Sequence, residues 1–243
     1  MKKTLLFVLL TLMPVMVWAS EEKSCGAIDC EPFHADIKNK ESLQRGARTF
    51  MNYCMGCHTT EYMRYTHVAE HLGVPTEMFL KNLVLDGSKI GDLMQNGMTK
   101  AYSKKVFGAP PPDLTLVARA RSPQWLYTYL RSFYADSSRP YGVNNLVFKD
   151  VGMPHVLLEL QGMPECAEKN HEGHCEGVET KHTGAMKPEE FDRTIYDLVN
   201  YMTYIAEPMQ EDRKHIGIYV LLFLAFFFVW TYLLNREYWK DVH

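Results

Sequence analysis

An uncharged run near the C-terminus, residues 216–235, constrains the fold of this chain more than any other feature. Its sequence, IGIYVLLFLAFFFVWTYLLN, has no polar face on a helix, and about 20 such residues cross a bilayer. Aromatic residues near its ends, such as Tyr219 and Trp239, are typical of membrane interfaces. A buried core helix is the alternative, but a run this uniform favours a transmembrane helix at 216–235, with a polar linker at 209–215 before it and a tail at 236–243 after it.

The N-terminus has the features of a secretory signal peptide. Two lysines precede an apolar stretch, residues 4–17, and Ala19 ends a plausible cleavage site. An uncleaved membrane anchor is the alternative, but the stretch is short and is interrupted by Pro14, which favours cleavage. Loss of residues 1–19 would leave residues 20–208 as an exported domain and the C-terminal tail in the cytoplasm.

The composition of the chain indicates a globular domain. It is 47% hydrophobic and 23% charged, as folded domains are, and a formal net charge of −3 gives no reason to expect nucleic-acid binding. An amphipathic helix is expected over residues 188–206, because apolar residues recur there at helical spacing after Pro188 and two glutamates.

The stretch YCMGCHT, residues 53–59, places Cys54 and Cys57 three apart, with His58 next. A redox dithiol, half of a zinc site and covalent attachment of haem all use such a pattern. Zinc needs further ligands at paired spacing, and a thioredoxin-like dithiol lies in a βαβ setting; the sequence shows neither context. In the third chemistry, two thiols add to the vinyl groups of one porphyrin, and the following imidazole is the proximal iron ligand. The single motif therefore predicts one haem c, held by Cys54, Cys57 and His58.

The residue on the other side of the iron is less constrained by the sequence. Methionine opposite histidine suits electron transfer and raises the reduction potential. Met153 and Met163 lie in identical Gly-Met-Pro contexts, and the spacing does not separate them. His155 is a third alternative, although a packed or surface histidine is the simpler interpretation of it.

Several segments together resemble the bacterial cytochrome c1 family, whose members are the haem subunit of the quinol–cytochrome c oxidoreductase, or cytochrome bc1 complex. The resemblance implies a mainly α, cytochrome c-like haem domain with inserted loops and one C-terminal transmembrane helix. It matches the Gly-Met-Pro at 152–154 to the axial methionine, which selects Met153 over Met163, and it packs the helix at 188–206 across the one that carries Phe50. The segments that carry the resemblance are RGARTFMNYCMGCH (45–58), GAPPPDLTLVARAR (108–121), WLYTYLRSFY (125–134), RPYGVNNLVF (139–148), VGMPHVLLELQG (151–162) and the C-terminal 216–243.

The resemblance also implies roles for residues near the haem. Arg121 corresponds to an arginine that meets a haem propionate, a group that must be paired when it is buried. Arg119 lies two residues away and is expected to be a surface residue. Pro111 and Pro112 look like a rigid wall on the proximal side, or simply a loop, and Trp125 is either a contact of the haem edge or a core residue.

Electron transfer is the function that the resemblance implies. The haem would accept an electron from the Rieske iron–sulfur protein and pass it to a cytochrome c during respiratory, proton-translocating quinol oxidation. Cytochrome b would be a further partner in a dimeric complex of the bacterial inner membrane, with the haem domain in the periplasm. A free membrane-anchored electron carrier and a haem enzyme with an open sixth position, such as a peroxidase, are the alternatives.

Four further cysteines lie outside the haem motif. Cys166 and Cys175 enclose a polar stretch with histidines at 171, 174 and 182, which is compatible with zinc. A disulfide is favoured, because an exported protein is in an oxidising compartment. Cys25 and Cys30 are close enough to pair with each other, and cross-pairing between the two sets remains open.

Overall fold

The computed structural model describes residues 24–26, 28–169, 175–181 and 183–241. The signal peptide expected at 1–19 lies outside the described residues. Within them the chain is mainly helical, with three small antiparallel hairpins or strand pairs. The helices are α2 (Lys40–Tyr53), α3 (Tyr65–Leu72), α4 (Thr76–Leu83), α5 (Lys100–Phe107), α6 (Val117–Ala120), α7 (Pro123–Arg131), α8 (Leu158–Gln161), α9 (Pro188–Ala206) and α10 (Gln210–Tyr238). The strands are β1 (Thr60–Arg64), β2 (Leu93–Met94), β3 (Phe133–Ala135), β4 (Val143–Asn145), β5 (Glu165–Lys169) and β6 (Cys175–Glu179).

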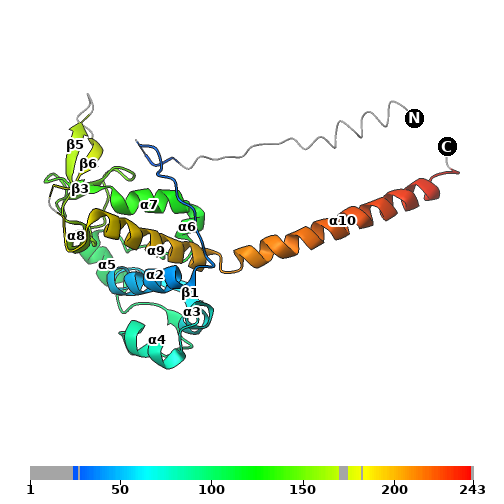
Figure 1. Cartoon of the computed structure of the whole chain (residues 1–243), viewed down its shortest axis with the longest axis horizontal. Helices are drawn as coiled ribbons and strands as arrows, with labels where there is room; N and C mark the ends of the chain where they lie inside the picture. The colour runs from blue at the N-terminus through cyan, green and yellow to red at the C-terminus, as the bar shows by residue number, and fades with distance from the viewer. Residues whose placement is uncertain (1–23, 27, 170–174, 182, 242–243) are drawn as a thin grey trace.

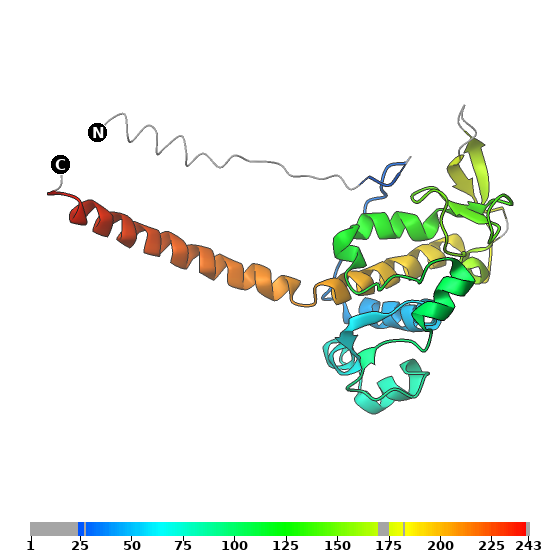
Figure 2. The same ribbon diagram turned by 180° about the vertical axis from the view of Figure 1, so that it is seen from behind.

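Helix α9 is the centre of the domain. It lies between α7 on one side and α2 on the other, as both views of the ribbon show (Figures 1 and 2). Its apolar residues Ile195, Leu198 and Tyr201 are fully buried, and Phe50 of α2 packs its ring against Tyr201 with centroids 5.6 Å apart. The predicted helix at 188–206 and its packing across the helix of Phe50 are thus confirmed.

The crossing of α2 and α9 depends on a glycine. A Cβ atom placed on Gly46 would lie 2.0 Å from the backbone oxygen of Asp197 and 2.7 Å from Cβ of Tyr201. Real Cβ atoms do not approach other atoms so closely, because interiors are packed at van der Waals distances. Only glycine therefore allows the two backbones to reach this separation.

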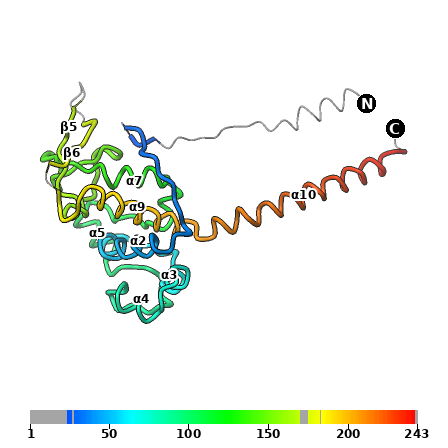
Figure 3. The backbone as a smooth tube through the Cα atoms, in the orientation of Figure 1, coloured from blue at the N-terminus to red at the C-terminus, as the bar shows by residue number. Residues whose placement is uncertain are grey.

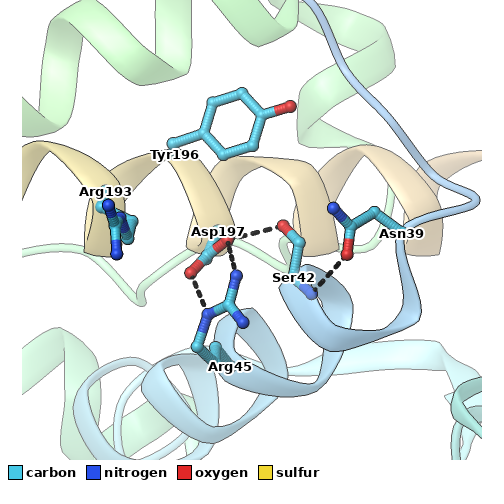
Figure 4. Close-up of a pocket in the computed structure, with 6 residues that line it drawn as sticks. All are labelled: Asn39, Ser42, Arg45, Arg193, Tyr196 and Asp197. Atoms are coloured by element: carbon cyan, nitrogen blue, oxygen red, sulfur yellow. Dashed lines mark hydrogen bonds and ion pairs between the residues drawn. The ribbon is translucent and has the colours of Figure 1, made fainter.

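A buried carboxylate of α9 forms hydrogen bonds to α2 where the two helices cross (Figure 4). Asp197 of α9 is only 3% exposed, and its Oδ1 accepts a hydrogen bond of 2.6 Å from Oγ of Ser42 in α2. Its Oδ2 accepts a second bond of 2.6 Å, from Nε of Arg45. Asn200, one turn further along α9, donates to the same Ser42 hydroxyl over 3.0 Å. A buried charge must be paired in this way to be tolerated, so these contacts fix the register of α2 on α9.

Helix α10 projects from the domain by itself (Figure 3). It is apolar and long enough to cross a membrane, and none of its apolar stretch is buried in the domain. The polar segment expected to be a linker at 209–215 is itself helical from Gln210, so the 29-residue helix is roughly 43 Å long. It therefore extends beyond the ~30 Å hydrocarbon core of a bilayer.

Ion pairs tie the first turns of α10 to the domain. Glu207, which follows α9, pairs with Arg213 of α10, and Lys38 pairs with Glu211 over 3.4 Å. Water and salt screen ion pairs at a protein surface, so these pairs contribute little to stability. The short turn at residues 207–209 places the start of α10 at the C-terminal end of α9 (Figure 1).

Candidate haem-binding site

Helix α2 delivers the haem motif as a compact turn at its C-terminal end. The backbone N–H of Cys54 still donates to the carbonyl of Phe50 over 2.9 Å, and the N–H of His58 donates to the carbonyl of Cys54 over 2.8 Å. Cys54 is buried and Cys57 is partly exposed, and neither is in a disulfide. The turn thus holds two thiols and one imidazole within five consecutive residues of the fold.

The burial of Cys54 bears on which chemistry this motif performs. Desolvation, with a smaller effect of the neighbouring Cys57, raises the pKa of Cys54 to about 12. The Cys54 thiol is therefore protonated at neutral pH, which does not favour disulfide exchange, because that reaction needs a thiolate. No group of three or more metal-ligating side chains gathers anywhere in the described part of the chain.

The ring of His58 is oriented by a backbone carbonyl. Its Nδ1 lies 2.8 Å from the carbonyl oxygen of Pro112, and a carbonyl only accepts hydrogen bonds, so Nδ1 carries the proton. Nε2 then has its lone pair free, as ligation of iron requires. Burial lowers the pKa of His58 and outweighs the opposing effect of the bond to Pro112, which keeps the imidazole neutral.

The loop of Pro112 is itself held by Asp113. Its Oδ2 accepts from Oγ1 of Thr59 over 2.8 Å and from the N–H of Glu61 over 2.7 Å, and its Oδ1 accepts from the N–H of Thr115 over 2.9 Å. Burial opposes the charge of Asp113, but these hydrogen bonds prevail and lower its pKa. The polyproline loop is thereby fastened to the residues that follow His58. The sequence indicated a wall here but not this hydrogen-bonding role.

Met153 lies against helix α7, partly buried. It packs on a small cluster formed by Phe133, Val143 and Val151, and the hydroxyl of Tyr129 lies 3.4 Å from its sulfur. Met163 packs on the same cluster, but among the described residues no hydroxyl donates to its sulfur. The two methionines are therefore both partly buried and differ in the hydroxyl that contacts the sulfur of Met153.

The third alternative for an iron ligand, His155, lies in the core. It is only 7% exposed, and its ring stacks on Phe133 with the centroids 5.0 Å apart. This placement fits the packed histidine that the sequence suggested as the simpler interpretation.

Arg121 follows α6 and turns towards the aromatic face of α7. Its guanidinium lies 5.3 Å from the ring centroid of Trp125, and Trp125 stacks on Tyr129 with the centroids 4.9 Å apart. Arg119 points elsewhere, with its guanidinium 3.9 Å from the carboxylate of Glu207. Trp125 and Tyr129, on one face of α7, therefore form a continuous row of contacts from Arg121 to Met153.

The four outer cysteines form two disulfides in the structure, Cys25–Cys30 and Cys166–Cys175. The second joins β5 to β6, a hairpin at the edge of the domain furthest from α10 (Figure 1). The histidines at 171, 174 and 182, which prompted the zinc alternative, lie outside the described residues.

Replacing both Cys166 and Cys175 by alanine is expected to loosen this hairpin and to leave the haem attached. A disulfide that closes a short loop stabilises by about 2–3 kcal/mol, and this one is remote from the turn of Cys54. Hydrogen exchange of the β5 and β6 amides should accelerate, while haem staining of the denatured chain stays constant. The Cys25/Cys30 double variant is the matched control. Loss of a bound zinc ion from the Cys166/Cys175 variant would contradict the disulfide assignment.

The haem-attachment motif belongs to a helical domain whose last helix projects alone as an apolar anchor, and these features define a membrane-bound c-type cytochrome. Comparison with known proteins narrows this class. The profile described as the Cytochrome C1 family matches residues 33–242, and the chain belongs to this family. It is accordingly an electron-transfer haem subunit of a bacterial cytochrome bc1 complex, with a covalently bound haem c and a single-pass membrane anchor.

Two individual relatives have the name of the family, and a third has a different name. The chain is 48% identical to cytochrome c1 of Allochromatium vinosum over the full length of both proteins. It is 25% identical to cytochrome c1 of Rhodospirillum rubrum, over 84% of this chain and 83% of that one. It is also 47% identical, over 86% of each chain, to a Nitrosomonas europaea protein named ammonia monooxygenase gamma subunit.

Proposed function

We propose that this chain carries one haem c, bonded through Cys54 and Cys57, and relays single electrons from the Rieske iron–sulfur protein to a cytochrome c. The hydrogen bond between Nδ1 of His58 and the carbonyl of Pro112 is the observation that carries the proposal. It leaves Nε2 available as an iron ligand beside two unpaired thiols, which is the arrangement a c-type haem requires.

Each of the other site residues has one task in this proposal. Met153 would be the second residue that holds the haem iron, and its thioether would favour the reduced state relative to harder ligands. Arg121 would hold a propionate by a charge-assisted hydrogen bond. When bound, haem c supplies a one-electron couple between ferric and ferrous iron. The protein side chains would keep both iron ligands in place, and electron transfer needs no acid or base. The reductase activity belongs to the whole complex, in which this chain is an electron relay.

The proposed topology places residues 20–208 in the periplasm of a bacterial inner membrane and the tail, residues 236–243, in the cytoplasm. The signal-like N-terminus and the projecting α10 support this orientation. The short turn between α9 and α10 would keep the haem domain close to the membrane surface, where cytochrome b and the Rieske protein of a dimeric complex would be within reach.

Purification of the tagged chain in a mild detergent tests the proposal. A reduced-minus-oxidised spectrum should show b- and c-type haem together, and quinol should drive reduction of added cytochrome c. The pyridine haemochrome of the isolated subunit should give one haem c per chain. Deletion of the Rieske protein should abolish the quinol-driven reduction while the c-type spectrum remains.

Three other outcomes would point away from the proposal. A c-type band without b haem under gentle extraction would favour a free anchored carrier. Binding of carbon monoxide by the reduced protein without displacement of a ligand would favour an open haem enzyme. Copurification with subunits of a monooxygenase, the enzyme in the name of the Nitrosomonas europaea relative, would indicate a different assembly.

A further inference from the structure

The sulfur of Met153 has a specific hydrogen-bond donor. The phenol oxygen of Tyr129 lies 3.4 Å from the sulfur, a normal separation for an O–H···S contact with a large, polarizable acceptor. A tyrosine hydroxyl that is largely removed from water needs a partner, and among the described residues the acceptor for Tyr129 is the Met153 sulfur. A thioether sulfur has two lone pairs, so it can accept this bond and still ligate a metal.

The ring of Tyr129 is held between two aromatic neighbours, and its backbone is held by a third residue. Trp125 stacks on it with an interplanar angle of 10°, and Phe133 meets it edge-on with the centroids 5.2 Å apart. Its backbone carbonyl accepts a 2.8 Å hydrogen bond from the side chain of Asn145 in β4. Helix α7 and strand β4 thus fix the hydroxyl against the Gly-Met-Pro loop, and a group fixed in this way can act on the sulfur without a cost of reorganisation.

We infer that Tyr129 is a positioning residue that tunes the donor strength of the Met153 sulfur and thereby raises the reduction potential of the haem. The inference rests on the proposed function, in which Met153 ligates the iron. Hydrogen-bond donation withdraws electron density from the sulfur. The electron-poor ferric state loses more from a weaker donor than the ferrous state does, so the hydroxyl favours the reduced form.

Tyr129→Phe tests the inference in the detergent-extracted complex, because it removes one oxygen and keeps the ring and its packing. Redox titration of the c-type haem should show a shift of about three- to tenfold in the equilibrium towards the oxidised form, or roughly 30–60 mV for a one-electron couple. The far-red absorption band of a methionine–ferric iron bond should persist to higher pH than in the unmodified protein, because the sulfur is then the stronger donor.

Tyr127→Phe is the matched control on the same helix. Its ring packs against Phe33 and under the guanidinium of Arg131, and no hydrogen bond joins it to Met153 among the described residues, so the haem potential of this variant should stay unchanged. A monofluorinated tyrosine at position 129, whose hydroxyl is a stronger donor, should shift the potential in the opposite direction to phenylalanine. Equal haem potentials in Tyr129→Phe, the fluorotyrosine variant and the unmodified protein, with the far-red band intact, would overturn the inference.

Met153→Leu separates failure of the inference from failure of the proposed function. If this variant loses the far-red band and Tyr129→Phe leaves the potential unchanged, the tuning role is wrong and the ligand assignment stands. If the band survives in Met153→Leu and is lost in Met163→Leu, the ligand assignment is wrong and the tuning role falls with it.

Discussion

Met153→Leu is expected to lower the reduction potential of the haem by on the order of 100 mV or more, since axial ligands set haem potentials over a range of about 0.8 V. Leucine has nearly the volume of methionine, so the apolar cluster of Phe133, Val143 and Val151 should remain packed. Each 59 mV is roughly a tenfold change in a one-electron equilibrium. Reduction of this subunit by its donor should therefore become unfavourable by about fiftyfold, and quinol-driven reduction of cytochrome c should nearly stop.

Met163→Leu is the control for this prediction. Met163 shares the Gly-Met-Pro context and packs against the same cluster, so a general disturbance of packing would affect the two variants alike. Redox titration and the far-red absorption band should change only in Met153→Leu, with covalent haem unchanged in both. A large fall in potential in Met163→Leu alone would assign the ligand to Met163.

Features that depend on a local pattern could be predicted from the sequence. The helix at 188–206 ends where expected, because Pro188 and Pro208 flank an apolar stripe of helical period. The apolar anchor was equally clear, because a run of that length needs no tertiary contact to be recognised. The mainly α fold is confirmed by the structure, and the membership of the cytochrome c1 family is confirmed by the family match.

The boundary of the anchor was harder to place. The polar segment at 209–215 suggested a linker, yet from Gln210 onwards it is the first part of helix α10. Composition marks where the bilayer begins and carries little information on where the helix begins, since charged residues such as Glu211 and Lys214 are good helix formers. Their ion pair at i and i+3 adds to this tendency.

Contacts that orient the candidate ligands could not be predicted, because they join residues far apart in the chain. The carbonyl of Pro112 lies 54 residues from His58 along the sequence, and Tyr129 lies 24 residues from Met153. Neither contact leaves a periodic signal. Two signals were nevertheless present: an aspartate directly after the prolines, and aromatic residues at 125 and 129, which share one face of α7.

Gly46→Ala is expected to destabilise the domain strongly, although alanine is the better helix former by about 1 kcal/mol. Helix propensity alone thus predicts a gain in stability, whereas packing predicts a loss. The added methyl would lie 2.0 Å from the backbone oxygen of Asp197, and a backbone atom cannot move aside as a flexible side chain can. Helices α2 and α9 would have to separate, which strains the bonds from Ser42 and Arg45 to Asp197 and opens the core around Phe50.

A net loss of about 3–5 kcal/mol follows, as for other substitutions that overpack a core and disturb a buried charge. Domains are stable by only about 5–15 kcal/mol, so much of the variant should be unfolded or degraded before haem is attached. Denaturant unfolding of the full chain in detergent, followed by the haem absorption, measures the difference. Gly91→Ala is the control, because a Cβ there meets no atom within 4 Å and stability should change little. If Gly46→Ala proved as stable as this control, α2 and α9 could not be as close as the clash at Asp197 requires.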